Sequence, residues 1–128
     1  WPYYNELIKI IKSRHANLET AIAPGVNEIQ EAKKIDSISI MKNEESLSII
    51  ELAGLISKAS FIVANDTGPA HMTAHLGKSG VALFGYHTTA KKVSIETEEF
   101  KAITAKNLNE LSAENVYGEI KDKLQLIN

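Results

Sequence analysis

Short β-branched runs, each followed by a polar loop and a helix, constrain the fold of this chain more than any other feature. The clearest unit begins with Phe61–Ala64, an apolar run typical of a buried parallel strand. The polar loop Asn65–Gly68 follows, and Pro69 opens a helix that extends to about Leu76. Val81–Phe84 is then a second buried strand. This alternation of strand and helix predicts an open parallel sheet with right-handed crossovers.

The remaining segments keep the same alternation. We expect further helices at about 2–13, at 28–35, within 44–59 and from 112 to 124, and further strands at 20–23, 37–40 and 101–104. Asn27 is the expected N-cap of the helix at 28–35, and Ser112 that of the last helix. The chain begins with a helix, whereas a doubly wound sheet places a strand first, so we expect the missing strand upstream of Trp1.

Composition narrows the functional classes. The 128 residues are 44% hydrophobic and 23% charged, which indicates one globular domain and excludes a disordered chain. Lys and Arg total 14 against 16 Asp and Glu, so the basic surplus of a nucleic-acid binder is absent. There is no cysteine, which excludes disulfides and thiolate zinc sites. Without an apolar run long enough to span a bilayer or a signal-peptide pattern, we expect a cytoplasmic location.

The loops beyond the carboxyl ends of the strands are the expected ligand site, because ligands bind there in open parallel sheets. By this interpretation the loops are 24–28, 65–69 and 85–92. In the middle loop, a glycine just before a helix allows a ligand to approach the backbone at the positive end of the helix dipole. Thr67 and Gly68 therefore suit a phosphate, whereas Asp66 suits sugar hydroxyls. A plain turn at a helix start explains the same residues about equally well.

Two histidines, His71 and His75, lie four residues apart on the helix that follows this loop. A metal site is not expected, since Met72 stands where a zinc protease helix has its glutamate and no third ligand is evident. His71, in the first turn, is expected to touch an anionic ligand, and His75 to be a structural histidine. The chain also lacks a Walker loop, a G-x-G-x-x-G motif and a nucleophile elbow.

The runs Ile62–Lys78 and Val81–Gly85 closely resemble the signature of glycosyltransferase family 9, the ADP-heptose:lipopolysaccharide heptosyltransferases, in its C-terminal domain. The specific core is Asp-Thr-Gly-Pro-x-His, which spans Asp66–His71. Trp1-Pro2 resembles the Trp-Pro that opens the first helix of that domain, and Ser46-Leu47 the Ser-Leu before the signature strand.

The departures from the family pattern leave the phosphate loop intact. Ser79-Gly80 stands where the family usually has proline, Tyr86–Thr88 replaces its Pro-Thr, and His75 replaces a small residue. Sugar and acceptor specificity therefore remain open. The loop Tyr86–Lys92, which ends in two lysines, either contacts an anionic acceptor or is simply solvated.

The resemblance implies the GT-B architecture, in which two Rossmann-like domains face a cleft. Residues 1–128 would be the C-terminal nucleotide-sugar-binding domain, an open parallel sheet with helices on both faces. Thr67 and Gly68 would bind the donor phosphates, Asp66 the sugar hydroxyls, and His71 would stand beside the phosphate. Glu28 resembles, more loosely, the acidic residue at the nucleoside ribose. The base that activates the acceptor belongs to the N-terminal domain, and a phosphate-neutralising lysine precedes the Trp-Pro pair.

The implied reaction is an inverting, metal-independent transfer of a heptose-like sugar, with ADP-heptose as the expected donor and no cofactor. The acceptor would be the lipopolysaccharide core or a related glycolipid, reached by peripheral contact at the cytoplasmic face of the inner membrane. This chain alone would be inactive. The alternatives are a non-catalytic nucleotide-sugar-binding or interaction module that retains the fold, and a nucleotide-binding α/β domain of another kind, such as a sugar epimerase relative.

Overall fold

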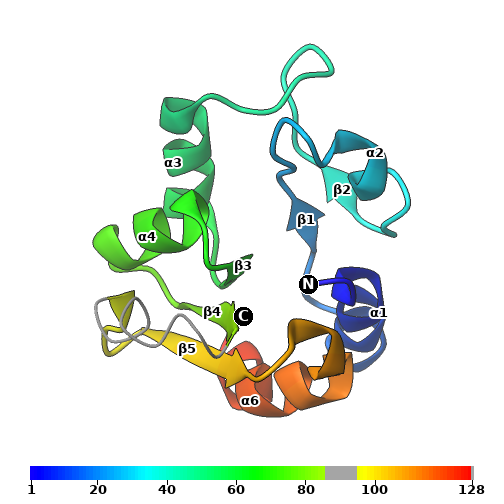
Figure 1. Cartoon of the computed structure of the whole chain (residues 1–128), viewed down its shortest axis with the longest axis vertical. Coiled ribbons are helices and arrows are strands. Elements are labelled where there is room, and N and C mark those ends of the chain that lie inside the picture. Colours follow the sequence, from blue (N-terminus) through cyan, green and yellow to red (C-terminus); the bar gives the residue numbers. More distant parts are fainter. Residues whose placement is uncertain (86–94, 128) are drawn as a thin grey trace. The chain divides into compact units, whose positions relative to one another are not determined.

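The computed structural model describes residues 1–85 and 95–127, and the chain divides into two compact units. The first unit contains Trp1–Pro2 and Ala53–Ser112, and the second contains Tyr3–Leu52 and Ala113–Asn128. Both units combine parallel strands with helices (Figure 1). Among the described helices, none has the length and apolar character needed to cross a membrane.

The first unit contains a three-stranded sheet in the order β3-β4-β5, and all of its strand pairs are parallel. The strands are β3 (Ile62–Asn65), β4 (Gly80–Gly85) and β5 (Phe100–Ala105). Helix α4 (Gly68–His75) joins β3 to β4, and the 3₁₀ helix η2 (Leu108–Glu110) follows β5 (Figure 1). The register pairs Ile62 with Gly80 and Gly80 with Phe100, so the carboxyl ends of the three strands meet at one edge.

Small and aromatic residues share the core of this unit. Phe84 and Phe100 are fully buried, and each contributes on the order of 2 kcal/mol through its buried apolar surface. The core also contains an isoleucine and alanines from α4 and the sheet, namely Ala64, Ala70, Ala82 and Ile95. Because alanine is small, α4 lies close against the sheet. The backbone of the β3–α4 loop is therefore held by a packed helix and a packed strand.

The second unit pairs two short parallel strands, β1 (Ala21–Ile22) and β2 (Ile38–Ser39), with the short helix α2 (Ile29–Ala32) between them in sequence. Its two long helices, α1 (Tyr4–Arg14) and α6 (Ala113–Gln125), contact each other (Figure 1). Their buried residues follow helical spacing: Leu7, Ile8 and Ile11 on α1, and Val116, Ile120 and Leu124 on α6.

A buried polar pair also lies within the second unit. His15, which is only 7% exposed, has its Nε2 atom 2.9 Å from the hydroxyl oxygen of Tyr117. The Arg14 guanidinium stands 5.0 Å from the centre of the Tyr117 ring and forms an ion pair with Glu114. The bond pairs the Nε2 atom of His15 with the Tyr117 hydroxyl, and among the described residues no fully buried side-chain nitrogen or oxygen lacks a partner.

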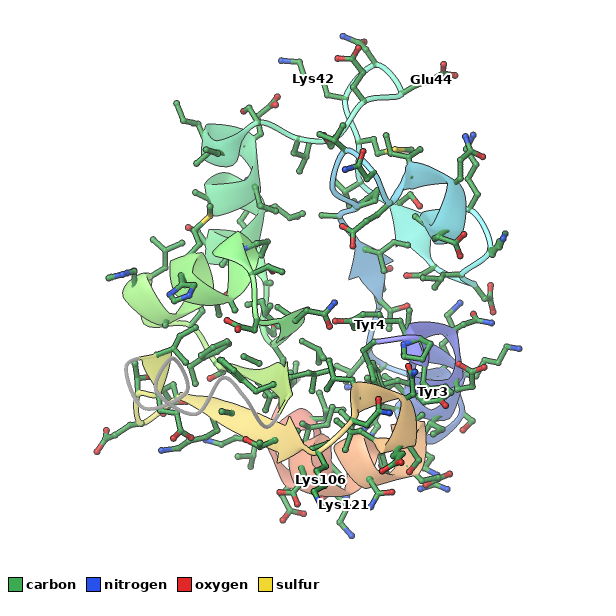
Figure 2. The ribbon with its side chains drawn as sticks, viewed as in Figure 1. Tyr3, Tyr4, Lys42, Glu44, Lys106 and Lys121 are labelled. Carbon is green, nitrogen blue, oxygen red and sulfur yellow. The ribbon has the colours of Figure 1, made fainter. Side chains whose placement is uncertain are left out.

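Helix α3 (Ile49–Lys58) begins in the second unit and ends in the first. A reciprocal capping box closes its start. The Glu51 amide donates to the Ser48 hydroxyl, and the Ser48 amide donates to the Glu51 carboxylate at 2.9 Å. This bond and the Lys42 ammonium, 3.1 Å away, hold the pKa of Glu51 below its ordinary value. Lys42 and Glu44 lie on the loop that precedes α3 (Figure 2).

The predicted parallel α/β class, with helices flanking the strands, is confirmed, and two local expectations change. The strands form two hydrogen-bonded sheets, of two and three strands. The helix expected within 44–59 is confirmed, and it begins at Ile49 because Ser48 and Glu51 cap it there. The helix expected at 28–35 is shorter and follows Glu28, so Asn27 is not its N-cap. The closing helix begins directly after Ser112, as expected.

Candidate functional site

The predicted phosphate loop lies where β3 ends and α4 begins, at the carboxyl edge of the three-stranded sheet. Thr67 has an extended backbone, with φ −146° and ψ −179°, and α4 begins at the next residue, Gly68. The Thr67 carbonyl accepts the amides of Ala70 and His71, at 3.1 and 3.3 Å. Pro69 fits the first turn because its missing N–H would have no helical acceptor there.

The start of α4 is open to solvent. Thr67, Gly68 and His71 are exposed, and Asp66 is half-buried. The Thr67 hydroxyl donates to the Asn65 carbonyl over a long 3.4 Å and does not cap the helix. Within the described part of the chain, the Gly68 amide has no acceptor. This end of the helix therefore presents a backbone N–H, a hydroxyl and the positive end of the dipole.

The fold does not require a glycine at position 68. A Cβ added there would meet no atom of the described residues within 4 Å, and the residue has no left-handed φ. By contrast, Gly77, which follows α4, has a φ of +66° and needs the conformational freedom of glycine. The absence of a side chain at Gly68 keeps open the space in front of an exposed amide, and a ligand oxygen could use that space.

Glu28 lies on the turn after β1 and belongs to the second unit, whereas the other four predicted site residues are nearly consecutive in the first. The Gly25 amide donates to Oε1 of Glu28 at 2.9 Å, and the Glu28 amide donates to the Gly25 carbonyl at 3.0 Å. Burial and the nearby Glu28 carboxylate raise the pKa of Tyr4, a residue in the first turn of α1 (Figure 2). Asp66, Thr67, Gly68 and His71 thus lie together at the start of α4, and their ligand roles, like that of Glu28, stay predictions.

His71 and His75 are both exposed on α4. The expectation that His75 is a structural histidine is therefore wrong, because Ala70 and Thr73 are the residues of helix α4 that are buried in the core. Among the described residues, no group of three His, Cys, Asp or Glu side chains could hold a metal ion. The loop 86–92, with its two lysines, lies outside the described residues, which end at Gly85 before this loop.

Sequence reasoning missed a cavity of about 530 Å³ in the second unit. Its lining comes from the segments that follow β1 and β2 and from α2, including Val26, Ile29, Lys33 and Met41. Val26, one of the lining residues, is 78% exposed. No motif marks this cavity; the only sequence signal is its place beyond the carboxyl ends of two predicted strands.

Comparisons with known proteins identify a family and a set of similar folds. The model of glycosyltransferase family 9 (heptosyltransferase) matches residues 1–120. A structure of E. coli heptosyltransferase WaaC with ADP-2-deoxy-2-fluoro heptose aligns at a TM-score of 0.76 and 20% identity, covering 94% of this chain and 37% of that one. WaaC with ADP aligns at 0.73 and 21% identity, covering 98% and 40%.

The structural likeness shows a shared fold, and this chain spans well under half the length of the WaaC chains. No curated protein sequence matches it. The family match nevertheless extends over nearly all of the chain and includes the loop from Asp66 to His71. The chain belongs to glycosyltransferase family 9, the heptosyltransferase family.

Proposed function

We propose that this chain is the C-terminal, nucleotide-sugar-binding domain of a heptosyltransferase that uses an ADP-linked donor such as ADP-heptose. The observation that carries the proposal is the open start of α4, where the exposed Gly68 amide and Thr67 hydroxyl stand within a chain of this family. The WaaC structures contain ADP and an ADP-linked fluoro-heptose, which supports an adenosine diphosphate donor.

In this proposal the start of α4 holds the donor diphosphate. The Gly68 amide and Thr67 hydroxyl donate to phosphate oxygens, aided by the helix dipole, and His71 stands beside them as a further donor. Asp66 accepts hydrogen bonds from sugar hydroxyls, since a carboxylate accepts but cannot donate when ionised. Glu28 contacts the ribose. Each role fits the charge and hydrogen-bonding capacity of its residue.

The proposed reaction is an inverting displacement without a metal. An acceptor hydroxyl oxygen bonds to the anomeric carbon, the bond from that carbon to the diphosphate breaks, and the nucleoside diphosphate leaves with the electron pair. The acceptor proton passes to a carboxylate of the N-terminal domain of the longer protein. The residues of this chain stabilise the negative charge that develops on the leaving diphosphate.

The proposed acceptor is a lipopolysaccharide core or related glycolipid, met at the cytoplasmic face of the inner membrane. An acceptor of this kind places its sugar hydroxyl near a lipid surface, so peripheral contact is sufficient for access. The proposal predicts that the 128-residue chain binds donor nucleotide yet shows no transferase turnover, because it does not carry the base. Glycosyl transfer by the purified chain would contradict this division of labour.

The test is an NMR titration of the chain with ADP, UDP and GDP. We expect ADP to shift the amides of residues 66–71 most strongly, and H71A to weaken ADP binding by roughly 10-fold, the loss of about one charge-assisted hydrogen bond. D66N should weaken binding of ADP-heptose but not of ADP, because ADP lacks the sugar that Asp66 contacts in this proposal. H75A is the matched control, because His75 is also exposed but lies at the far end of α4. If all three nucleotides at millimolar concentration leave this loop unshifted, the donor site is elsewhere.

A further inference from the structure

We propose that Gly25 is a positioning residue, which fixes the carboxylate of Glu28 so that one oxygen is held and the other faces the ribose of the bound nucleotide. This inference rests on the proposed function, because it adds a second residue to the contact that Glu28 makes there. It concerns the turn after β1, which lies in the second unit.

Two hydrogen bonds close this turn upon itself. The Glu28 amide donates to the Gly25 carbonyl at 3.0 Å, and the Gly25 amide returns a bond to Oε1 of Glu28 at 2.9 Å. The side chain of Glu28 is thereby tied at its far end as well as at its backbone. A glutamate at an exposed position otherwise samples many rotamers, so this bond selects one orientation of the carboxylate before any ligand arrives.

A side chain at position 25 would displace the Glu28 carboxylate from the place where the Gly25 amide holds it. A Cβ added at Gly25 would lie 2.7 Å from Oε1 of Glu28, closer than real Cβ atoms come to an oxygen, and 3.7 Å from its Cδ. No left-handed φ explains this glycine, in contrast to Gly77, and no backbone atom fills the space, in contrast to Gly80. Its missing side chain makes room for the oxygen that its amide binds.

The second oxygen of Glu28 has no hydrogen-bond partner in the part of the chain that the structure describes, and the residue is exposed. An ionised carboxylate held by one N–H keeps lone pairs for further donors. Adjacent hydroxyls of a ribose are donors of the matching kind. The raised pKa of Tyr4, due to burial and then to the Glu28 charge, agrees with a carboxylate kept near that phenol. Gly25 thus prepares Glu28 to distinguish ribose from deoxyribose.

The experiment compares ADP with 2′-deoxy-ADP and 3′-deoxy-ADP in the wild-type chain, G25A, E28Q and the double variant. We expect the wild-type chain to bind ADP roughly 10-fold more tightly than at least one deoxy analogue, as for one hydrogen bond to a charged group. E28Q and G25A should each reduce that preference to about 3-fold or less. The double variant should show the same reduced preference as either single variant, because both changes remove one and the same contact. A general loss of stability would weaken all three ligands equally and leave the ratio unchanged.

G118A is the matched control, since Gly118 lies in the same unit and a Cβ there meets nothing within 4 Å. If G25A keeps the full preference while E28Q loses it, Gly25 does not position the carboxylate. The inference about Gly25 then fails, while the proposed contact of Glu28 with the ribose stands. If E28Q keeps the preference, Glu28 does not contact the ribose and that part of the proposed function fails with it. Should G25A not fold, the Gly25 amide proton of the wild-type chain must shift as Glu28 titrates; a pH-independent signal overturns the inference.

Discussion

Helix α4 and strand β4 each begin with a glycine, but the two glycines have opposite relations to the fold. A Cβ at Gly80 would lie 2.2 Å from the carbonyl oxygen of Ile62 and 3.1 Å from a ring carbon of Phe100. A Cβ at Gly68 would contact no atom in the part of the chain that the structure describes. Packing therefore explains Gly80 completely and Gly68 not at all. The difference shows that a residue type left unexplained by its own structure is the better guide to a ligand.

The strongest test of this comparison is G80A. Because the clash is with backbone on a central strand, neither β3 nor β4 can relax without losing register, and we expect a loss of about 3 kcal/mol in the free energy of unfolding. Urea denaturation would measure it. G54A is the control, since Gly54 lies in α3 and a Cβ there has free space. A G80A chain as stable as the wild-type chain would mean that the strands are not packed as described.

The opposite result is expected for G68A. Alanine fits the helical backbone and the open space, so stability should be unchanged or higher by about 0.5 kcal/mol. Binding of ADP should nevertheless weaken about 10-fold, because the new methyl group separates the Gly68 amide from a phosphate oxygen. Calorimetric titration with ADP, run beside thermal unfolding, measures both quantities. Unchanged ADP affinity would show that no ligand approaches this amide closely.

The strand–loop–helix order of the first unit was predictable because its signals are local. Four apolar residues, a polar loop and a proline determine β3 and α4 within about two residues of their observed bounds. The boundaries of α2 and α3 were less predictable, since they depend on which side chain folds back upon the backbone. The Ser-x-x-Glu spacing of Ser48 and Glu51 was the available signal for α3.

Other features depend on contacts between distant segments and leave no local trace. Nothing near His15 in the sequence indicates that it pairs with Tyr117, 102 residues away. The sequence position of His75 is compatible with a structural histidine, yet this residue is exposed. The buried residues of helix α4 are Ala70 and Thr73 instead. The reason for a glycine at position 80 is likewise visible only once Ile62 is aligned beside it.

The starts of α3 and α4 give the last and smallest test of the comparison. At α3 the Ser48 hydroxyl accepts the Glu51 amide, so S48A should lower the free energy of unfolding by about 1 kcal/mol. At α4 the Thr67 hydroxyl caps nothing, so T67A should change stability by less than about 0.5 kcal/mol while weakening ADP binding. Thermal unfolding of both variants, with an ADP titration of each, separates the two roles. A loss in T67A equal to that in S48A would mean that Thr67 serves the helix, and the hydroxyl would then not be reserved for a ligand.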